Sequence, residues 1–364
     1  MQPGAIAPAN NREGPNAARI EGEDVMTLTI RAGLLAGSAL VAAPAAAEDV
    51  LSAVHAFPAS LVYSQSFLEF VDKVNERGEG VVRIDVRGGP EAIGMFQQPE
   101  AVRNGVVDMV QTPGSFYGGI VPEKDALVAT NIAAPEAREN GGIALIDEIH
   151  QEKMNVKYLG WFDSGITFNI WSVDEPKLDA EGNLDISDWK LRGNAIYNAF
   201  FTDYLDASVI DMPSTDTYSA LETGLINATG WTQIGLIDFK WDEFLNWRID
   251  PEFFSTDIGV IVNLDKWNSL GEEARTILQE VAIEHEVSSY EAMQERRDRE
   301  FEQLAEGGMQ SIALEGEARE NFLKAAREST YNRMREQMEQ HPMGVEHYDR
   351  LIELFYDPAK DQAS

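Results

Sequence analysis

The sequence predicts an α/β protein of two lobes with largely parallel sheets. The chain has 364 residues, and at roughly 150 residues per domain this length suggests two lobes and a core large enough to be self-supporting. Hydrophobic residues make up 44% of the chain, which is typical of globular proteins and too high for a disordered acidic chain. After residue 47, strand-like apolar runs alternate with segments of helical periodicity. This alternation is typical of βαβ units.

Charge and cysteine content exclude several classes of protein. The chain has 62 Asp and Glu residues against 29 Lys and Arg, for a formal charge of −33. Nucleic acids and anionic membrane surfaces bind cationic faces, so neither is an expected partner. The chain has no Cys, which excludes disulfides, a thiol nucleophile and any Cys-ligated zinc or iron–sulfur site. Export stays compatible with this composition, because a large core does not need disulfides.

The N-terminal segment has the features of an export signal. Residues 32–47 form the only long apolar run, and it is shorter than the roughly 20 residues that a membrane-spanning helix needs. The run ends in three alanines followed by two acidic residues, a typical cleavage pattern. We predict a signal peptide at 26–47, preceded by an upstream stretch at 1–25 that is not part of it, and a mature chain that starts at Glu48. A buried N-terminal helix is the alternative, and no membrane insertion of the mature chain is expected.

The first part of the mature chain alternates between strands and helices. Val82, Ile84 and Val86 alternate with charged residues, which indicates a half-buried strand. Apolar residues at helical spacing predict the first helix. The expected elements are a strand at 50–57, a helix at 60–76, a strand at 81–87, a helix at 98–105, a strand at 106–111, a helix at 136–152, and strands at 156–162 and 166–173.

The second part continues the same pattern after a polar, turn-rich segment at 174–188, which we interpret as a lobe crossing or a surface insert. Ser269 and Glu272 have the spacing of a capping box, and the helical pattern that follows runs to about 306 without Pro or internal Gly. The other expected elements are a strand at 189–192, a helix at 195–205, a strand at 209–212, a helix at 214–223, a short strand near 225–229 and a strand at 257–263. We expect lobe 1 to comprise 48–171 plus 255–295, and lobe 2 to comprise 172–254 plus 296–364.

Motifs of common enzyme classes are missing. The sequence contains no G-x-G-x-x-G, G-x-x-x-x-G-K-[ST], G-x-S-x-G or H-E-x-x-H. His341 and His347 are spaced too widely for one helix face, so they do not predict a metal site. With 62 acidic residues, carboxylate pairs occur by chance and say little about acid–base catalysis. The sequence therefore predicts no catalytic residue, no cofactor and no metal.

The most informative region is 189–235. The run WKLRGNAIYNAFF places Arg192 at the end of a short strand, just before Gly193, Asn194 and an expected helix. Ligands of open α/β sheets bind outside the carboxyl ends of strands, so Arg192 is expected to face a crevice. A surface Arg in an ion pair is the alternative interpretation. Trp231 follows an expected strand in the same way, and a core Trp is the alternative there.

Four segments of the chain resemble the substrate-binding proteins of tripartite ATP-independent periplasmic (TRAP) transporters, the DctP-type family. The segments are WKLRGNAIYNAFF, MPSTDTYSALETGLIN, GGPEAIGMFQQPEAVRNGVVDM and VNLDKWNSLGEEARTILQEVA. The resemblance covers essentially the whole mature chain. It implies the two-lobed periplasmic binding protein fold, with a cleft between α/β lobes and a long helix spanning both.

The resemblance also implies a function and a site. It implies a periplasmic receptor, not an enzyme, that binds a small organic acid and delivers it to TRAP membrane permease subunits. Arg192 matches the family Arg that pairs with the ligand carboxylate. Thr167 stands where a second family Arg often lies, which argues against a two-Arg dicarboxylate site. Gly230 stands where some members carry Glu before the Trp, which argues against a metal-bridged ligand.

The expected ligand-binding residues are Arg192, Trp231, Asn194, Phe57, Asn169 and Thr167. Because the acidic chain repels anions at long range, capture of an acid needs a local cation. Arg presents two parallel donors that match a carboxylate, which Lys cannot do. Aromatic residues at strand ends supply the apolar walls of a ligand cleft. One Arg with several aromatic residues predicts a monocarboxylate with an apolar or aromatic body.

Two other functions stay open. A periplasmic α/β hydrolase or lyase requires a nucleophile, a base and an orienting group that converge in the cleft, and the sequence offers no such set. An ABC-type sugar-binding receptor fits the aromatic residues, but it does not need Arg192 in the cleft. The chemical identity of a copurified ligand separates these functions.

Overall fold

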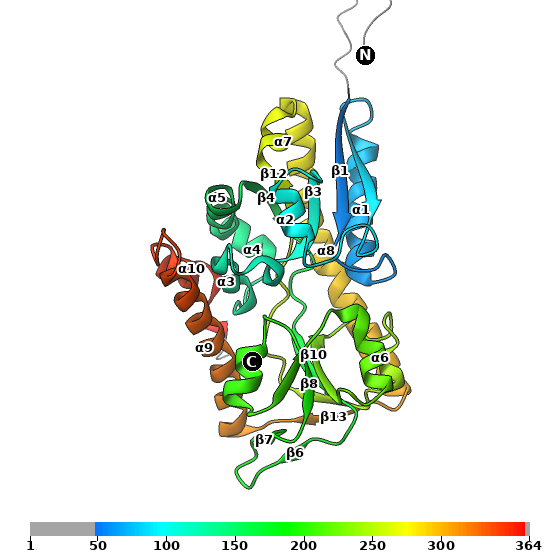
Figure 1. The fold of residues 1–364 in the computed structure, drawn as a ribbon, viewed down its shortest axis with the longest axis vertical. Helices are drawn as coiled ribbons and strands as arrows, with labels where there is room; N and C mark the ends of the chain where they lie inside the picture. The colour runs from blue at the N-terminus through cyan, green and yellow to red at the C-terminus, as the bar shows by residue number, and fades with distance from the viewer. Residues whose placement is uncertain (1–47, 361–364) are drawn as a thin grey trace, which may run out of the picture. The chain divides into compact units, whose positions relative to one another are not determined.

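The computed structural model describes residues 48–360, which form two main sheets with helices packed against them (Figure 1). The first sheet has the strand order β2 (Val82–Gly88), β1 (Asp49–His55), β3 (Met109–Pro113), β12 (Ile258–Asn263), β4 (Val156–Trp161). The second has the order β13 (Gln310–Ala313), β11 (Trp247–Asp250), β5 (Phe168–Ser172), β10 (Ala228–Thr232), β8 (Lys190–Gly193), β9 (Ser208–Asp211). The predicted α/β class is confirmed.

The structure has helices at most of the predicted positions, with shifted ends, and four that were not predicted, at 125–128, 264–269, 316–339 and 348–355. The helices are α1 (Val62–Arg77), α2 (Gln98–Arg103), α3 (Asp125–Val128), α4 (Ala134–Glu139), α5 (Gly142–Met154), α6 (Thr217–Glu222), α7 (Leu264–Ser269), α8 (Glu272–Glu306), α9 (Gly316–Glu339) and α10 (Tyr348–Phe355). Within the polar segment 174–188, β6 (Lys177–Leu178) and β7 (Leu184–Asp185) pair with each other in a two-stranded sheet. This segment is therefore a surface insert.

The sheets are mixed, so the expectation of largely parallel strands is corrected. β1 pairs in parallel with β2 and β3, and β8 pairs in parallel with β9 and β10. β12 is antiparallel to both of its neighbours, and β5 is antiparallel to β10 and β11. Parallel neighbours need a long crossover, usually a helix. β5 and β12 each follow a short segment that comes from the other sheet. The need for a long crossover between parallel neighbours therefore does not determine the direction of these two strands.

Two short segments connect the sheets side by side. Residues 162–167 lead from β4 to β5, and residues 251–257 lead from β11 back to β12. Thr167 and Ser255 form a β-bridge, and the hydroxyl of Thr256 donates to the carbonyl of Asp163 (2.9 Å). The first crossing thus lies before residue 168, not near 172. The paired segments are well placed to act as a hinge.

The long helix α8 reaches both sheets, as predicted. It packs against α1, α4 and β4 (Figure 1). Further along, its Phe301 ring lies 6.3 Å from the Trp171 ring of β5. The helix begins at Glu272, but the predicted capping box is wrong. Ser269 is the last residue of α7, and its hydroxyl donates to the carbonyl of Lys266 (2.7 Å).

Three other elements differ from the sequence prediction. The helix expected at 136–152 is split into α4 and α5 at Gly141, whose φ of +91° interrupts the helix. The helix expected at 195–205 is a shorter turn with a π-helical segment at Phe200–Tyr204. The strand expected near 225–229 is β10, three residues later, so Trp231 lies within the strand and does not follow it.

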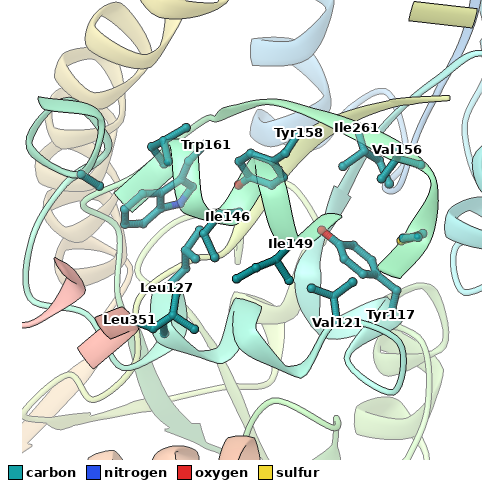
Figure 2. Close-up of a cluster of buried hydrophobic side chains, with 14 of the residues drawn as sticks. Tyr117, Val121, Leu127, Ile146, Ile149, Val156, Tyr158, Trp161, Ile261 and Leu351 are labelled. Atoms are coloured by element: carbon teal, nitrogen blue, oxygen red, sulfur yellow. The ribbon is translucent and has the colours of Figure 1, made fainter. Parts of the chain in front are cut away.

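Separate hydrophobic clusters cover the sheets. Ile146 and Ile149 of α5 pack against Val156, Tyr158 and Trp161 of β4 (Figure 2). The same cluster includes residues of α9 and α10, among them Met334 and Leu351. A second cluster joins β5, β8 and β10 to Phe200, Phe254 and Phe322. The lobe boundaries expected from the sequence remain a proposal. They place most of β5 in lobe 1 and α10 in lobe 2, whereas β5 lies in the second sheet and α10 packs on the first.

The predicted signal peptide and the stretch before it lie outside the described residues. Among residues 48–360, no helix is long and apolar enough to cross a bilayer.

Candidate functional site

A cavity of about 40 Å³ lies where strand ends of the two sheets meet. It is lined on one side by residues that follow β1 and β3, precede β12 or begin α1, and on the other by residues of β5, β8, β10 and the turn after β8. These residues are Phe57, Tyr63, Pro113, Ser115, Phe116, Thr256, Asp257 and Ile258, together with Phe168, Arg192, Asn194, Ile196, Tyr197, Trp231 and Thr232. This is the position at which open α/β sheets bind ligands.

Arg192 is the cation of this cavity. It lies near the carboxyl end of β8 and is only 2% exposed. One terminal guanidinium nitrogen, Nη1, donates to the hydroxyl of Tyr197 (2.7 Å), and the guanidinium carbon lies 5.6 Å from the centre of the Trp231 ring. Its Nε is buried without a hydrogen-bond partner, and no described carboxylate lies within ion-pair distance. Arg192 is therefore not the surface ion pair of the alternative interpretation.

An unpaired buried guanidinium is unfavourable unless an anion joins it. The hydrogen bond that Arg192 donates to Tyr197 leaves the rest of the guanidinium fork available to such an anion. Burial raises the pKa of Tyr197, while the charge of Arg192 opposes that rise. The phenol therefore stays protonated and accepts from Arg192 without neutralising it. The arrangement is suited to a single carboxylate.

Aromatic rings form the cavity walls. Phe57 contacts Phe116 and Trp231 edge-on, with ring centroids 6.1 and 6.3 Å apart. The indole nitrogen of Trp231 donates to the carbonyl of Ile234 (3.1 Å), which fixes the ring. Edge-to-face contacts of this kind hold rings in defined positions. The walls thus present flat apolar surfaces beside the guanidinium of Arg192.

Gly230 explains why no acidic side chain stands beside Trp231. A Cβ built at Gly230 would lie 3.0 Å from the Phe201 ring and 3.1 Å from the Tyr197 ring. The sheet is too closely covered at this point to admit a carboxylate without displacing those rings. Among the described residues, no group of three or more His, Asp or Glu side chains is arranged to hold a metal ion.

Four of the six expected site residues line the cavity: Arg192, Trp231, Asn194 and Phe57. The side-chain oxygen of Asn194 accepts from the backbone N–H of Ile196 (3.0 Å), so this residue also shapes the turn after β8. Thr167 and Asn169 are not among the lining residues. Phe168, which stands between them, does line the cavity, because successive side chains of a strand point to opposite faces.

Asn169 has partners of its own behind the cavity. Its side-chain amide donates to the carbonyl of Ile249 and to the carboxylate of Asp250, both at 2.9 Å. Thr167 instead lies in a recess on the outer side with Pro251 and Phe253. Both residues thus support the strand that presents Phe168.

Sequence reasoning missed Tyr63, Tyr197, Phe168, Phe116 and Asp257. Asp257 precedes β12, and its carboxylate accepts from the backbone N–H of Ser115 (2.7 Å) and lies 3.7 Å from the ammonium of Lys124. Burial raises the pKa of Asp257, and Lys124 opposes the rise. Of the five, only Tyr197 had a sequence signal, since it belongs to the same quoted run as Arg192.

A Ser–His–Asp group lies outside the cavity, between α1, α8 and the first crossing segment. The Ser66 hydroxyl is 2.6 Å from Asp163 Oδ1 and 3.0 Å from His285 Nε2. In a catalytic triad the carboxylate binds the second ring nitrogen of the histidine. Here Asp163 binds the serine, and His285 Nδ1 faces Lys73 (3.5 Å). The group lacks the geometry of an activated nucleophile.

Two α/β lobes, two paired crossing segments and a cavity with one cation that no carboxylate pairs define the class of two-lobed ligand-binding proteins. Within that class, the chain belongs to the DctP family of bacterial extracellular solute-binding proteins, family 7, whose model matches residues 53–337. The resemblance seen in the sequence is thereby confirmed. Members of this family bind solutes and are not enzymes.

A curated relative supports the same assignment. A solute-binding protein of Albidiferax ferrireducens is 24% identical over 222 residues, which cover 58% of this chain and 64% of that protein. This chain thus spans less than two thirds of the length of the curated relative that it matches.

Solved structures show the same fold at low identity. A Bordetella pertussis extracytoplasmic solute receptor that binds pyroglutamic acid has a TM-score of 0.71 at 15% identity, covering 84% of this chain and 99% of that one. A TRAP solute-binding protein of Bordetella bronchiseptica, with copurified calcium and picolinate, has a TM-score of 0.73 at 19% identity, covering 87% and 93%. One from Desulfovibrio salexigens with bound orotic acid has a TM-score of 0.72 at 17% identity, covering 85% and 97%. The predicted two-lobed fold is confirmed.

Proposed function

We propose that this protein is the extracytoplasmic receptor of a TRAP transporter, and that it binds a small organic acid and delivers it to the membrane permease subunits. The observation that carries the proposal is Arg192, a buried guanidinium that lines the cavity and has no carboxylate partner of its own. A carboxylate ligand supplies the missing charge. The solved relatives named above, with pyroglutamic acid, picolinate and orotic acid, support an acid as the ligand.

The ligand class that fits best is a compact monocarboxylate with an apolar or aromatic body. Arg192 is the only Arg or Lys among the lining residues, so a second carboxylate has no cation to meet it. Phe57, Phe116 and Trp231 offer ring surfaces to an apolar body. The cavity of about 40 Å³ favours a small ligand over an extended one. A sugar receptor does not require the buried guanidinium.

We assign the ligand contacts to Arg192, Trp231, Asn194 and Phe57, and we assign Thr167 and Asn169 a supporting role behind Phe168. The test replaces Arg192 by Met and by Lys and measures affinity by calorimetry for a panel of small carboxylic acids. Loss of a buried ion-pair partner costs about 2–5 kcal/mol, a factor of roughly 30 to several thousand in Kd. Lys is also expected to weaken binding strongly, because it cannot form the bidentate pair.

The matched control is Arg350→Met, because Arg350 lies on the surface of α10 and pairs with Glu353. This change is expected to alter affinity by less than about fivefold. Near-wild-type affinity in a folded Arg192→Met protein would remove the basis of the assignment. Mass spectrometry of small molecules released on denaturation distinguishes an acid from a sugar.

We further propose that the protein is periplasmic and that the signal peptide is cleaved after Ala47. The small-residue boundary before Glu48 motivates the site. The intact mass of protein isolated from the periplasm is expected to correspond to a chain that starts at Glu48. A soluble periplasmic form that retains residues 32–47 would contradict this prediction.

A further inference from the structure

A second polar group faces the cavity without a partner. Tyr63 lies in the first turn of α1 and lines the cavity on the side opposite Arg192. Its side chain is 1% exposed, and its hydroxyl oxygen is buried without a hydrogen bond. The Thr232 hydroxyl is near enough to lower the pKa of Tyr63, yet no hydrogen bond of normal geometry joins the two groups, and Thr232 donates its own proton to the carbonyl of Ile234 (2.8 Å).

An unsatisfied buried hydroxyl is destabilising, and native proteins contain few of them. Phenylalanine would fill the same space without leaving a polar atom unpaired. The position of the ring is well fixed, since it contacts Phe57 with ring centroids 6.1 Å apart. The hydroxyl is therefore a preformed hydrogen-bonding group at the wall of the ligand cavity.

The protonation state of Tyr63 defines what it can bind. Burial raises the pKa of Tyr63 well above its ordinary value, and the nearby carboxylates of Asp163, Glu300 and Asp238 raise it further. The phenol therefore keeps its proton at any physiological pH. Because the hydroxyl makes no hydrogen bond of normal geometry within the protein, it is a donor that is open to an acceptor on the ligand.

The aromatic walls connect this donor to the cation. Tyr63 contacts Phe57, Phe57 contacts Trp231 (6.3 Å between centroids), and Arg192 lies over Trp231. A ligand whose carboxylate meets Arg192 thus has its body along Phe57 and Trp231, and the remote part of that body meets Tyr63.

We propose that Tyr63 is a specificity-determining residue, whose hydroxyl donates a hydrogen bond to a carbonyl, hydroxyl or ring-nitrogen acceptor on the body of the bound acid. This inference rests on the proposed function and narrows its ligand class to compact monocarboxylates that carry a second hydrogen-bond acceptor. Sites built to hydrogen-bond a ligand group discriminate against analogues that lack it, because the protein group then stays unpaired. Tyr63 thus selects against purely hydrocarbon acids.

The test is a cycle that removes the acceptor from the ligand and the donor from the protein. Calorimetry compares three matched pairs: 3-hydroxyphenylacetate with phenylacetate, isonicotinate with benzoate, and pyroglutamate with cyclopentanecarboxylate. In the wild-type protein, at least one acceptor-bearing acid is expected to bind about 5- to 100-fold more tightly than its partner. In Tyr63→Phe this preference is expected to fall below about threefold.

The control is Tyr218→Phe, because the Tyr218 hydroxyl pairs with Glu243 outside the cavity (2.8 Å). It is expected to keep the wild-type preference. A preference that survives in Tyr63→Phe overturns the inference. So does a wild-type protein that binds both members of every pair equally, a result that needs no variant to fold. Failure of the wild-type protein to bind any carboxylic acid instead overturns the proposed function.

Discussion

Lys73, His285, Ser66 and Asp163 form a chain of polar groups from the surface to the first crossing segment. Burial lowers the pKa of His285 to about 3, so its ring is neutral. The distances fit donation from Lys73 to His285 Nδ1, from Nε2 to Ser66 and from Ser66 to Asp163. Asp163 Oδ2 has no partner, and burial raises the pKa of this carboxyl to about 7.

The raised pKa of Asp163 predicts an effect of pH on stability. Between about pH 4 and pH 7 the folded chain keeps a proton on Asp163 that the unfolded chain has released, so this group lowers the free energy of unfolding as the pH rises. His285 acts in the opposite sense between about pH 3 and 6.5. Of these two groups, only His285 still contributes to the pH dependence of the free energy of unfolding in Asp163→Asn.

Urea denaturation at pH 4.5 and 7.5 tests this prediction. The free energy of unfolding of Asp163→Asn, relative to wild type, is expected to increase by roughly 1–4 kcal/mol over this range. The same substitution at Asp349, which is exposed on α10, is expected to give a pH-independent difference. An Asp163→Asn difference that does not change with pH would mean that the carboxyl is ionised in the folded protein.

Single residues of the site differ in how far the sequence could predict them. Arg192 and Trp231 belong to recognisable segments, and both line the cavity. The sequence predicted Thr167 and Asn169 as ligand contacts, but Phe168, which stands between them, lines the cavity. A shift of one residue along a strand moves a side chain to the opposite face of the sheet. Tyr63 could not be predicted, because it meets Trp231 and Thr232 of β10 only across the cavity, and β10 is far away in the sequence.

At the scale of elements, Glu286 connects α8 to the first sheet. It is 1% exposed, and its carboxylate accepts from the backbone N–H of Trp161 (2.8 Å) and from Arg138 Nη2 (2.7 Å). Burial raises the pKa of Glu286, and Arg138 opposes the rise. This contact holds the helix that spans both lobes at the end of β4, next to the first crossing segment.

Removing this carboxylate is expected to destabilise the protein strongly. Glu286→Ala leaves Arg138 and the Trp161 N–H without their acceptor, and breaking a buried pair costs about 3–5 kcal/mol. Glu284, two residues earlier, pairs with Arg77 on the surface, so Glu284→Ala is expected to cost less than about 1 kcal/mol. Urea denaturation measures both. Equal effects of the two substitutions would show that Glu286 has no anchoring role.

The sequence predicted most elements but not the breaks between them. Alternation and helical periodicity are local properties, and they located most elements up to β10 as well as β12 and α8. They did not locate α3, α7, α9, α10, β11 or β13. Gly141 separates α4 from α5 because its backbone is in the left-handed region. Hydrophobic periodicity carries no information about such a break. Strand direction in β5 and β12 depends on how the chain crosses between sheets, and this is a property of the tertiary structure.

At the scale of the whole molecule, the charge of −33 opposes the proposed function. The chain repels anions at long range, and salt screens this repulsion over about 8–10 Å. Capture of an acid therefore depends on the short-range pair with Arg192, strengthened by burial. Because Arg192 and Tyr63 are 2% and 1% exposed, the protein has to open before a ligand can reach them.

We therefore predict that the ligand-free protein opens and that ligand closes it about the crossing segments. The chain has no cysteine, so pairs of introduced cysteines can carry spin labels without background. Val106 follows α2, Leu225 follows α6 on the second sheet, and both are exposed. The distance between labels at these two positions is expected to be longer and more broadly distributed without ligand, and shorter and narrower at saturation.

Labels at Val106 and Ile283 provide the control for this prediction, because α8 packs on the first sheet at Ile283. Their separation is expected to be the same with and without ligand, since both lie on one side of the hinge. The paired segments at 162–167 and 251–257 bend together, because the bridge between Thr167 and Ser255 couples them. Identical Val106–Leu225 distances in samples that bind ligand by calorimetry would contradict hinge closure. Ligand would then have to enter by local side-chain movement at Phe116, where the cavity adjoins an outer recess.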